Sequence, residues 1–253
     1  MTANFKGKIL TSLSEISAHE WDSVANPASV EFNPFISHAF LWALEKSGSA
    51  TEKTGWAGHH IVVEQADKIV GLAPCYLKSH SQGEYVFDHG WADAFSRAGG
   101  SYYPKLQVSV PFSPVVATKI NGHNSEARTA VSKVIEAACD QNGYSSAHIT
   151  FASDQDLELL SAKKKNWLER NDIQFHWHNA GYKSFDDFLA ALSSSKRKNL
   201  RKERQAVRDS GIEMKALTGD DITPAHWDVF WKFYIDTGNR KWGQPFSRVV
   251  FSR

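Results

Sequence analysis

The spacing of apolar residues over the first 180 positions predicts strands and helices in turn. Alternating or short continuous apolar runs indicate strands at residues 8–11, 60–64, 68–72, 105–110, 147–151 and 173–178. Apolar residues three and four apart indicate helices around Trp21 and at residues 38–46, 125–142 and 154–170. The strand at 68–72 is expected to run on through Pro74, with a bulge or a sheet edge at the proline, and residues 83–100 are expected to be a loop. This order predicts an α/β domain with a mixed sheet flanked by helices.

A pair of helices is expected after residue 181. Ser184 and Asp187 have the spacing of a capping box at the start of the first helix. Three serines separate it from a second helix that ends before Gly211. In the second helix, Leu200 and Val207 lie about a quarter turn from a stripe of arginines, and we expect them to pack on the protein. That stripe recurs at i, i+4, i+7 and i+11 and consists of Arg197, Arg201, Arg204 and Arg208.

The start of this basic helix has an unusual charge distribution. Lys196, Arg197 and Lys198 lie in its first turn, where the helix dipole is already positive. Cations there are unfavourable unless an anion binds to them and to the free backbone N–H groups. Arginine also offers a planar fork for phosphate or carboxylate. The helix is therefore either a phosphate-binding site, formed by these three residues with Arg201, Arg204 and Arg208, or a solvated basic face paired with acids elsewhere.

The end of the chain repeats features of its beginning. Residues 217–228 (LTGDDITPAHWD) echo residues 13–22 (LSEISAHEWD), and residues 245–251 (PFSRVVF) echo residues 34–40 (PFISHAF), in the same order. We therefore expect a first domain at 1–180, a helix pair at 181–211 and the incomplete start of a second domain at 212–253. On this hypothesis the chain is a truncated fragment that is inactive by itself, and Trp227, Phe230 and Trp231 expose apolar surface.

Composition narrows the class of protein. Hydrophobic residues make up 42% of the 253 residues, which is typical of a globular chain. The net charge of +1 makes the basic helix a local feature, so we expect no DNA partner. Cys75 and Cys139 lie far apart, and residues 1–10 lack the apolar core of a signal peptide. No apolar run approaches the ~20 residues of a membrane span. These features predict a cytoplasmic protein.

Several segments together resemble one protein family. They are residues 33–41 (NPFISHAFL), 102–107 (YYPKLQ), 111–114 (PFSP), 175–177 (FHW), 196–198 (KRK), 201–204 (RKER) and 240–243 (RKWG). The chain is similar in these to the bacterial FemAB-like predicted N-acyltransferases, and its plan resembles that of the Fem-type peptidoglycan acyltransferases. The resemblance implies a GNAT-like first domain, the helix pair and a second, truncated GNAT-like unit.

The same resemblance implies a reaction. It is the transfer of an acyl or aminoacyl group to an amine, in cell-wall metabolism, with acyl-CoA or aminoacyl-tRNA as the donor and no metal. One segment departs from the pattern, because residues 115–119 (VVATK) stand where similar proteins carry a Gly-Pro-Arg-like turn. GNAT enzymes hold the CoA pyrophosphate at that turn, on backbone N–H groups. We therefore expect the first domain not to bind CoA there.

Acyl transfer to an amine needs a general base and groups that stabilise the oxyanion. His176 shares a strand face with His178, so the two are a base or a metal pair, or simply surface residues, and no third ligand has a suitable spacing for a metal. Asp88 and His89 are an acid–base pair or a turn. Further candidates for contact with a phosphate, nucleotide or glycan, or for plain structural roles, are Tyr103, Lys105, Arg240, Lys241 and Trp242.

Two functions from different classes are consistent with these features. The first is a FemAB-like N-acyltransferase whose basic helix holds a phosphate-bearing group, such as CoA, the acceptor arm of a tRNA or a nucleotide-linked cell-wall precursor. The second is a non-catalytic RNA-binding or phosphate-recognition module that uses the same helix. RNA binding that weakens steeply with salt and no acyl transfer would indicate the second function.

Overall fold

The computed structural model describes residues 4–86, 88–161 and 166–241. The chain divides into two compact units. The first consists of Met1–Trp167 with Pro224–Arg253, and the second of Leu168–Thr223. The domain boundaries expected at residues 180 and 211 stay a prediction. We describe each unit separately.

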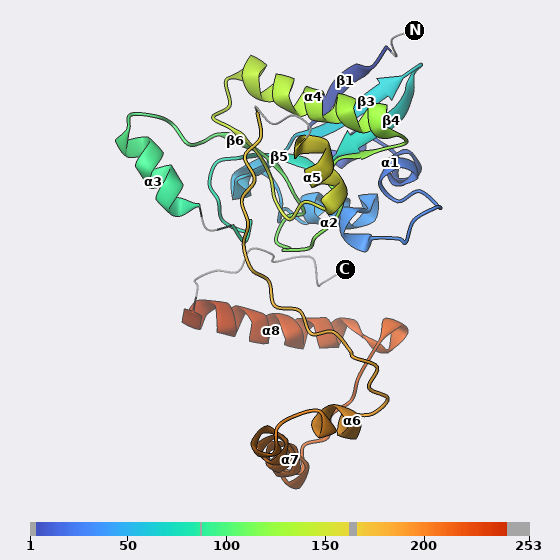
Figure 1. The fold of residues 1–253 in the computed structure, drawn as a ribbon, viewed down its shortest axis with the longest axis vertical. Helices are drawn as coiled ribbons and strands as arrows, with labels where there is room; N and C mark the ends of the chain where they lie inside the picture. Colours follow the sequence, from blue (N-terminus) through green and yellow to red (C-terminus); the bar gives the residue numbers. More distant parts are fainter. Residues whose placement is uncertain (1–3, 87, 162–165, 242–253) are drawn as a thin grey trace. The chain divides into compact units, whose positions relative to one another are not determined.

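Two four-stranded sheets form the first unit (Figure 1). The first has the order β1-β3-β4-β7, all antiparallel, with β1 at Lys6–Leu10, β3 at His60–Gln65, β4 at Lys68–Ala73 and β7 at Asn121–Gly122. The second has the order β2-β5-β6-β8, with β2 at Trp56–Gly58, β5 at Cys75–Lys78, β6 at Lys105–Val108 and β8 at Ala147–Ile149. Strands β6 and β8 are parallel and the other neighbours antiparallel, which confirms the predicted α/β class with a mixed sheet.

Two continuous chain segments, residues 56–65 and 68–78, each contribute one strand to both sheets. His59 separates β2 from β3, and Pro74 separates β4 from β5. Across this junction the His59 N–H donates to the Cys75 carbonyl at 2.9 Å, and the Cys75 N–H donates to Nδ1 of His60 at 3.3 Å. Because proline has no N–H to give to a ladder, the chain changes sheets at Pro74 without leaving a buried donor unpaired.

Helices cover both faces of the first sheet (Figure 1). Ile61 and Val63 of β3 point to the face that packs on α4 (Ser125–Asn142), while Val62 points to the face covered by α1 (Ala18–Ala25) and α2 (His38–Lys46). This alternation is the period of two that a strand imposes on its side chains. The predicted bounds of α2 and α4 are confirmed, and the side chains of Ser17 and Ser37 cap α1 and α2.

Two helices of the first unit differ from the prediction. A helix, α3 (His89–Arg97), lies in the expected loop at 83–100, and none of its residues is buried. Helix α5 (Asp154–Ser161) is shorter than predicted; residues 162–165 lie outside the described residues, and 166–170 are not helical. Short 3-10 helices connect the others at Leu13–Glu15, Pro34–Ile36, Glu52–Thr54 and, in the second unit, Gly219–Asp221.

In the second unit, α6 (Phe185–Ala190) and α7 (Ser194–Asp209) form the predicted helix pair. Ser184 caps α6 as expected, with Asp187 completing the capping box. The strand predicted at 173–178 is wrong: the segment has no β assignment, and Phe175 is 96% exposed. The packing predicted for Val207 is also wrong, because Val207 is 42% exposed, whereas Leu200 is partly buried.

Helix α8 (Pro224–Lys241) begins at the proline where the sequence places the first helix of a second copy. Phe230 is 46% exposed, and Trp227 and Trp231 are partly exposed, in agreement with the expected apolar surface. The second echo, at 245–251, lies outside the described residues. The division into a complete and an incomplete copy therefore stays a prediction.

Asp156 holds the connection between β6 and α4 in place. Its buried carboxylate accepts hydrogen bonds from the backbone N–H groups of Lys119 (2.8 Å) and Ile120 (3.1 Å) and pairs with the guanidinium of Arg128 at 3.2 Å. We expect Asp156→Ala to lower the free energy of unfolding by about 3–5 kcal/mol, because it leaves these donors unpaired. Asp154→Ala, on the exposed side of the same helix, is the matched control. Urea denaturation of both variants makes the comparison, and equal stabilities would contradict this role.

Candidate functional site

A cluster of buried charges lies between β5, β6 and the loop that follows β5. Lys78 and Lys105 are directly opposite each other on the two strands, and neither side chain is exposed. Like charges in such a pair repel unless acids lie between them. The Lys105 ammonium donates to Ser81 Oγ (2.9 Å), Glu84 Oε2 (2.8 Å) and Asp88 Oδ2 (2.6 Å). Glu84 also lies 3.9 Å from the Lys78 ammonium, so this carboxylate links the two lysines.

The surroundings of Lys78 favour its neutral form. Its ammonium lies 3.4 Å from the centre of the Trp56 ring and donates to the Gln82 carbonyl at 3.3 Å. Burial lowers the pKa of Lys78 to about 7, against the opposing attraction of Glu84. Burial likewise raises the pKa of Glu84, although the charge of Lys105 counteracts it. Burial therefore shifts the pKa of both neighbouring groups in the direction that favours their neutral forms.

Three residues singled out in the sequence belong to this cluster. Burial would raise the pKa of Asp88, but hydrogen bonds from Lys105 and other neighbours outweigh it and lower that pKa to about 2. A carboxylate with so low a pKa is a weak general base near neutral pH. Asp88 also accepts from the Tyr102 hydroxyl at 2.9 Å, and Tyr103 hydrogen bonds Ser81 at 2.7 Å. Asp88 and Lys105 thus contact each other, while His89 begins α3 as an exposed residue.

The turn before α4, where the sequence departs from the CoA-binding pattern, is filled by its own lysine. The buried Lys119 ammonium donates to the carbonyls of Val115, Ala117 and Phe151, each at 3.1 Å. Burial lowers its pKa to about 8, against the attraction of Asp156. The N–H groups of Lys119 and Ile120 already donate to Asp156, so this turn does not offer them to a pyrophosphate.

The arginine stripe of α7 lies along α6. Arg197 donates to the Ala190 carbonyl at 3.1 Å, Arg201 lies 3.8 Å from the Asp186 carboxylate, and the Arg204 guanidinium stacks over the Phe185 ring at 4.0 Å. A ring face stabilises a guanidinium and leaves its N–H edge available for other partners. Arg201, Arg204 and Arg208 are exposed, with 60% of the Arg201 side chain in solvent, whereas Arg197 is partly buried. These contacts order three arginines without burying them.

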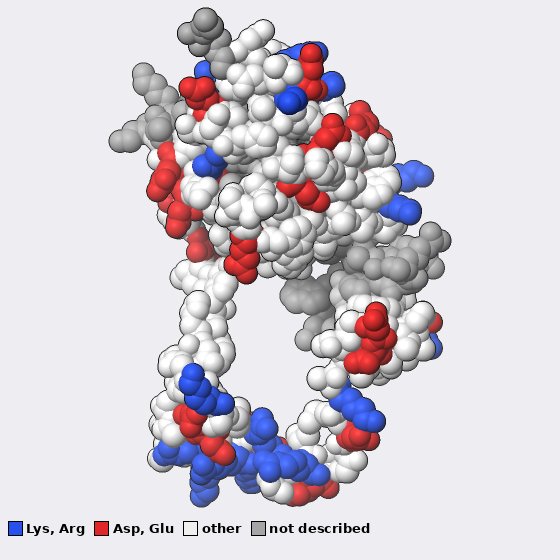
Figure 2. Space-filling view, turned by 90° about the vertical axis from the view of Figure 1, so that its right-hand side faces the viewer, with Lys and Arg blue, Asp and Glu red and all other residues white. Residues whose placement is uncertain are grey.

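The N-terminal turn of α7 brings further cations together. Lys196 and Lys198 are exposed, and the side chain of Ser193 does not cap the helix. Over its length, α7 carries seven cationic residues and two acids, Glu203 and Asp209. Figure 2 shows Lys and Arg gathered densely over this helix. The four arginines and these lysines together form a dense basic face.

The remaining predicted site residues make local contacts. His176 is exposed in the extended segment, hydrogen bonds Gln174 at 3.0 Å and stacks on His178 at 6.1 Å. Their shared orientation agrees with the predicted strand face, although no strand forms. Arg240, near the end of α8, pairs with Asp236 at 2.6 Å. Lys241 ends α8, nothing is described of its side chain, and Trp242 lies outside the described residues.

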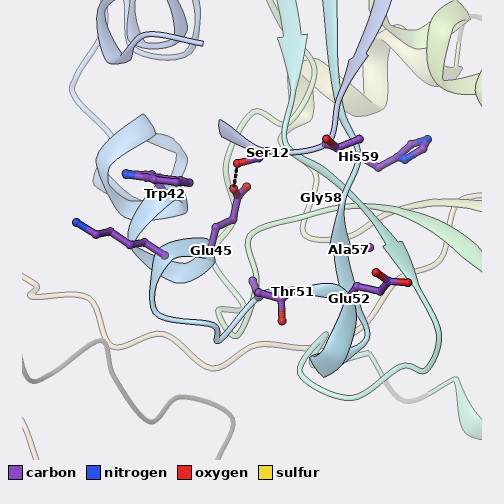
Figure 3. Close-up of a pocket in the computed structure, with 11 residues that line it drawn as sticks. Ser12, Trp42, Glu45, Thr51, Glu52, Ala57, Gly58 and His59 are labelled. Carbon is purple, nitrogen blue, oxygen red and sulfur yellow. Dashed lines mark hydrogen bonds between the residues drawn. The ribbon is translucent and has the colours of Figure 1, made fainter. Parts of the chain in front are cut away.

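An open hollow of about 480 Å³ lies where β1 leaves the first sheet (Figure 3). Helix α2 forms one wall with Trp42, Glu45 and Lys46, and β2 forms the opposite wall. The carboxylate of Glu45 accepts from Ser12 Oγ (2.9 Å), the Leu13 N–H (3.0 Å) and His60 (2.7 Å). The imidazole of His59 points to the side of the strand away from Glu45 (Figure 3).

Within the described ranges, no group of three or more His, Cys, Asp or Glu side chains is arranged to hold a metal ion. Of the helices in those ranges, none combines the length and apolar character needed to cross a bilayer.

Lys78 gives the first unit a pH dependence whose sign follows from its pKa. The folded value is about 7, against an ordinary 10.5, so the unfolded chain binds more protons between the two. The free energy of unfolding therefore rises with pH in this window, by about 1.4 kcal/mol per pH unit from this group. We expect Lys78→Met to remove that rise in urea titrations at about pH 7, 8, 9 and 10. Lys53→Met, at an exposed lysine, should retain it, and parallel curves for wild type and Lys78→Met would contradict the assignment.

Comparison with solved structures finds acetyltransferases at low similarity. A ribosomal-protein-alanine N-acetyltransferase from Brucella melitensis biovar Abortus 2308 is 12% identical, with a TM-score of 0.38 over 69% of this chain and 99% of that one. A glucosamine-6-phosphate N-acetyltransferase from Arabidopsis thaliana is 8% identical, with a TM-score of 0.37 over 69% and 98%. An aminoglycoside acetyltransferase from an uncultured soil metagenomic sample is 10% identical, with a TM-score of 0.37 over 69% and 96%. Scores this low do not align individual site residues.

No curated protein matches the chain. The profile of the FemAB-like family, described as peptidoglycan biosynthesis/recognition, matches residues 12–253 and so includes both units. This match confirms the resemblance seen in the sequence and agrees with the expected class of enzyme, a GNAT-type N-acyltransferase. The chain belongs to the FemAB-like family.

Proposed function

We propose that this protein is an N-acyltransferase that transfers an acyl group to an amine in peptidoglycan metabolism, and that α7 binds the phosphates of a substrate or acyl carrier. The observation that carries the proposal is the FemAB-like match over residues 12–253, which includes α7. The family description supplies the peptidoglycan context. Acyl-CoA is the donor we favour, because it combines an acyl group with several phosphates.

The contacts of α7 support its role in binding phosphate. Arg197, Arg201 and Arg204 are oriented by α6, and Arg201 and Arg204 stay exposed, so the N–H groups of these two can pair with an anion at little further cost in side-chain entropy. Each hydrogen bond between a guanidinium and a phosphate is charge-assisted and therefore strong. The first-turn N–H groups of α7 add donors in the orientation that helix N-termini present to phosphates.

The cations of the first unit are less suited to bind a phosphate than those of α7. Its buried cations are engaged within the protein, Lys105 by Glu84 and Asp88 and Lys119 by three carbonyls. A phosphate that reached them would have to break these contacts and enter a buried site. The exposed arginines of α7 need no such rearrangement, so α7 is the better phosphate site.

Removing two arginines tests this role. We expect the double variant Arg201→Ala, Arg204→Ala to bind the phosphate-bearing substrate about a hundredfold more weakly, because each lost charge-assisted contact contributes on the order of 1.5 kcal/mol. A thermal-shift screen against acetyl-CoA, UDP-linked precursors and tRNA identifies the ligand, since a ligand stabilises the fold that binds it. Transfer of labelled acetyl groups to amine acceptors should fall in parallel.

The double variant Lys53→Ala, Lys68→Ala removes two exposed lysines from the first unit and is the control for net charge. Its binding and transfer should equal those of the wild type. If the arginine variant also kept full affinity, α7 would not be the phosphate site. If the protein bound RNA with a steep salt dependence and transferred no acyl group, the RNA-binding alternative would replace the enzyme.

A further inference from the structure

Among the described residues, no strand pairs with the outer edge of β2, beyond the end of β1. Strand β1 pairs with β3 as far as Leu10, opposite His60, and the chain then turns away into the 3-10 helix Leu13–Glu15. The segment that carries β3 continues in the other direction as β2, beyond His59. Strand β2 is the outer strand of its sheet and pairs with β5 on one side only. Strand β1 stops pairing at His60, so it does not pair with the other edge of β2.

Backbone hydrogen bonds show which groups point to that edge. The His59 N–H donates to Cys75 at 2.9 Å, and bonded pairs alternate along an antiparallel ladder. The N–H and C=O groups of Ala57, opposite Leu77, therefore point to β5. Those of Trp56 and Gly58 point outward, away from β5. The Trp56 N–H donates to the Thr51 carbonyl at 2.8 Å, which agrees with this direction. Gly58 is thus the residue of β2 whose backbone groups point into the hollow.

The hollow beside Gly58 has the dimensions of a ligand site. Its volume of about 480 Å³ falls within the usual range for binding pockets. Trp42 and Glu45 on α2 face Ala57 and Gly58 across it (Figure 3). Its charged lining residues are Glu45, Glu52 and Lys46, so the wall carries an excess of one negative charge, which disfavours an acidic ligand.

We propose that this hollow binds an extended peptide segment, neutral or basic, that adds to the free edge of β2 by pairing with Gly58. An extended peptide alternates N–H and C=O groups at the spacing that a free strand edge presents. It would continue the line of β1 along the sheet, with side chains against Trp42 and Glu52. The site is distinct from α7, and peptide binding here does not depend on acyl transfer, so either proposal can fail without the other.

Gly58 itself is unsuitable for substitution, because a Cβ there would lie 2.3 Å from the Thr11 carbonyl oxygen. The test therefore changes the ligand. The probe is the acetylated, amidated pentapeptide Ala-Val-Lys-Val-Ala, titrated into the 253-residue chain by calorimetry. We expect binding, and at least a tenfold loss of affinity when two successive amides of the peptide are N-methylated, since either register then loses a donor to β2.

Hydrogen exchange identifies the contact residue by residue. The Gly58 amide should exchange at least tenfold more slowly with the peptide bound, while the Ala57 amide, already paired with Leu77, should change little.

In a second arm, Glu52→Lys should weaken binding of this basic peptide by about fivefold and strengthen binding of the same peptide with Glu in place of Lys. Glu31→Lys, an exposed charge change outside the hollow, is the control. Absence of binding, equal affinity of the N-methylated peptide, or protection that spares Gly58 would overturn the proposal.

Discussion

The hydrogen bond between the Cys75 N–H and Nδ1 of His60 lies at the point where one sheet becomes two. Because Nδ1 accepts this bond, Nε2 carries the proton and donates to Glu45 at 2.7 Å. Glu45 also accepts from Ser12 and Leu13, so the same carboxylate fixes the chain that leaves β1. The course of the two sheets, the exposed edge of β2 and the hollow beside it all depend on this junction.

Charge is used differently in the two units. In the first unit, Lys78, Lys105 and Lys119 are buried, and carboxylates or carbonyls satisfy their ammonium groups. Burying a charged group costs free energy unless its partners compensate for the lost hydration. The ammonium groups of these lysines therefore bind loop residues and hold the loops on the sheet. In the second unit, the cations of α7 stay in solvent and three are oriented by α6. Exposed, ordered arginines are suited to bind an external anion, which is why the proposed phosphate contact lies on α7.

Features that depend on neighbouring residues were predicted well from the sequence. The hairpin of β3 and β4, the bounds of α4 and the cap of α6 each follow from residues within about one or two turns of chain. The lysine–carboxylate cluster could not be predicted, because Lys105 reaches back 17 residues to Asp88 and 24 to Ser81. Lys78, next to the apolar pair Tyr76 and Leu77 in a strand, was the available signal for a buried lysine.

Two errors have the same physical origin. Residues 173–178 alternate as a strand should, but alternation forms a strand only where a partner edge is available, and Phe175 stays exposed. In α7 the spacing placed the arginines on one face correctly, yet Val207, which was expected to face the protein, is 42% exposed. In the structure the arginines contact α6 instead, through Ala190, Asp186 and Phe185. Periodicity groups residues on a face, whereas tertiary contacts decide which face is used.

The central claim is that the arginines of α7 hold the phosphates of the substrate. Phenylglyoxal modification of arginine, quantified peptide by peptide with and without bound acetyl-CoA or another phosphate-bearing ligand found to stabilise the protein, tests it most directly. The account predicts that ligand protects Arg201 and Arg204 from modification, while Arg128, which is bonded to Asp156 in the first unit, reacts at an unchanged rate. Saturating ligand that leaves the reactivity of Arg201 and Arg204 unaltered would contradict it.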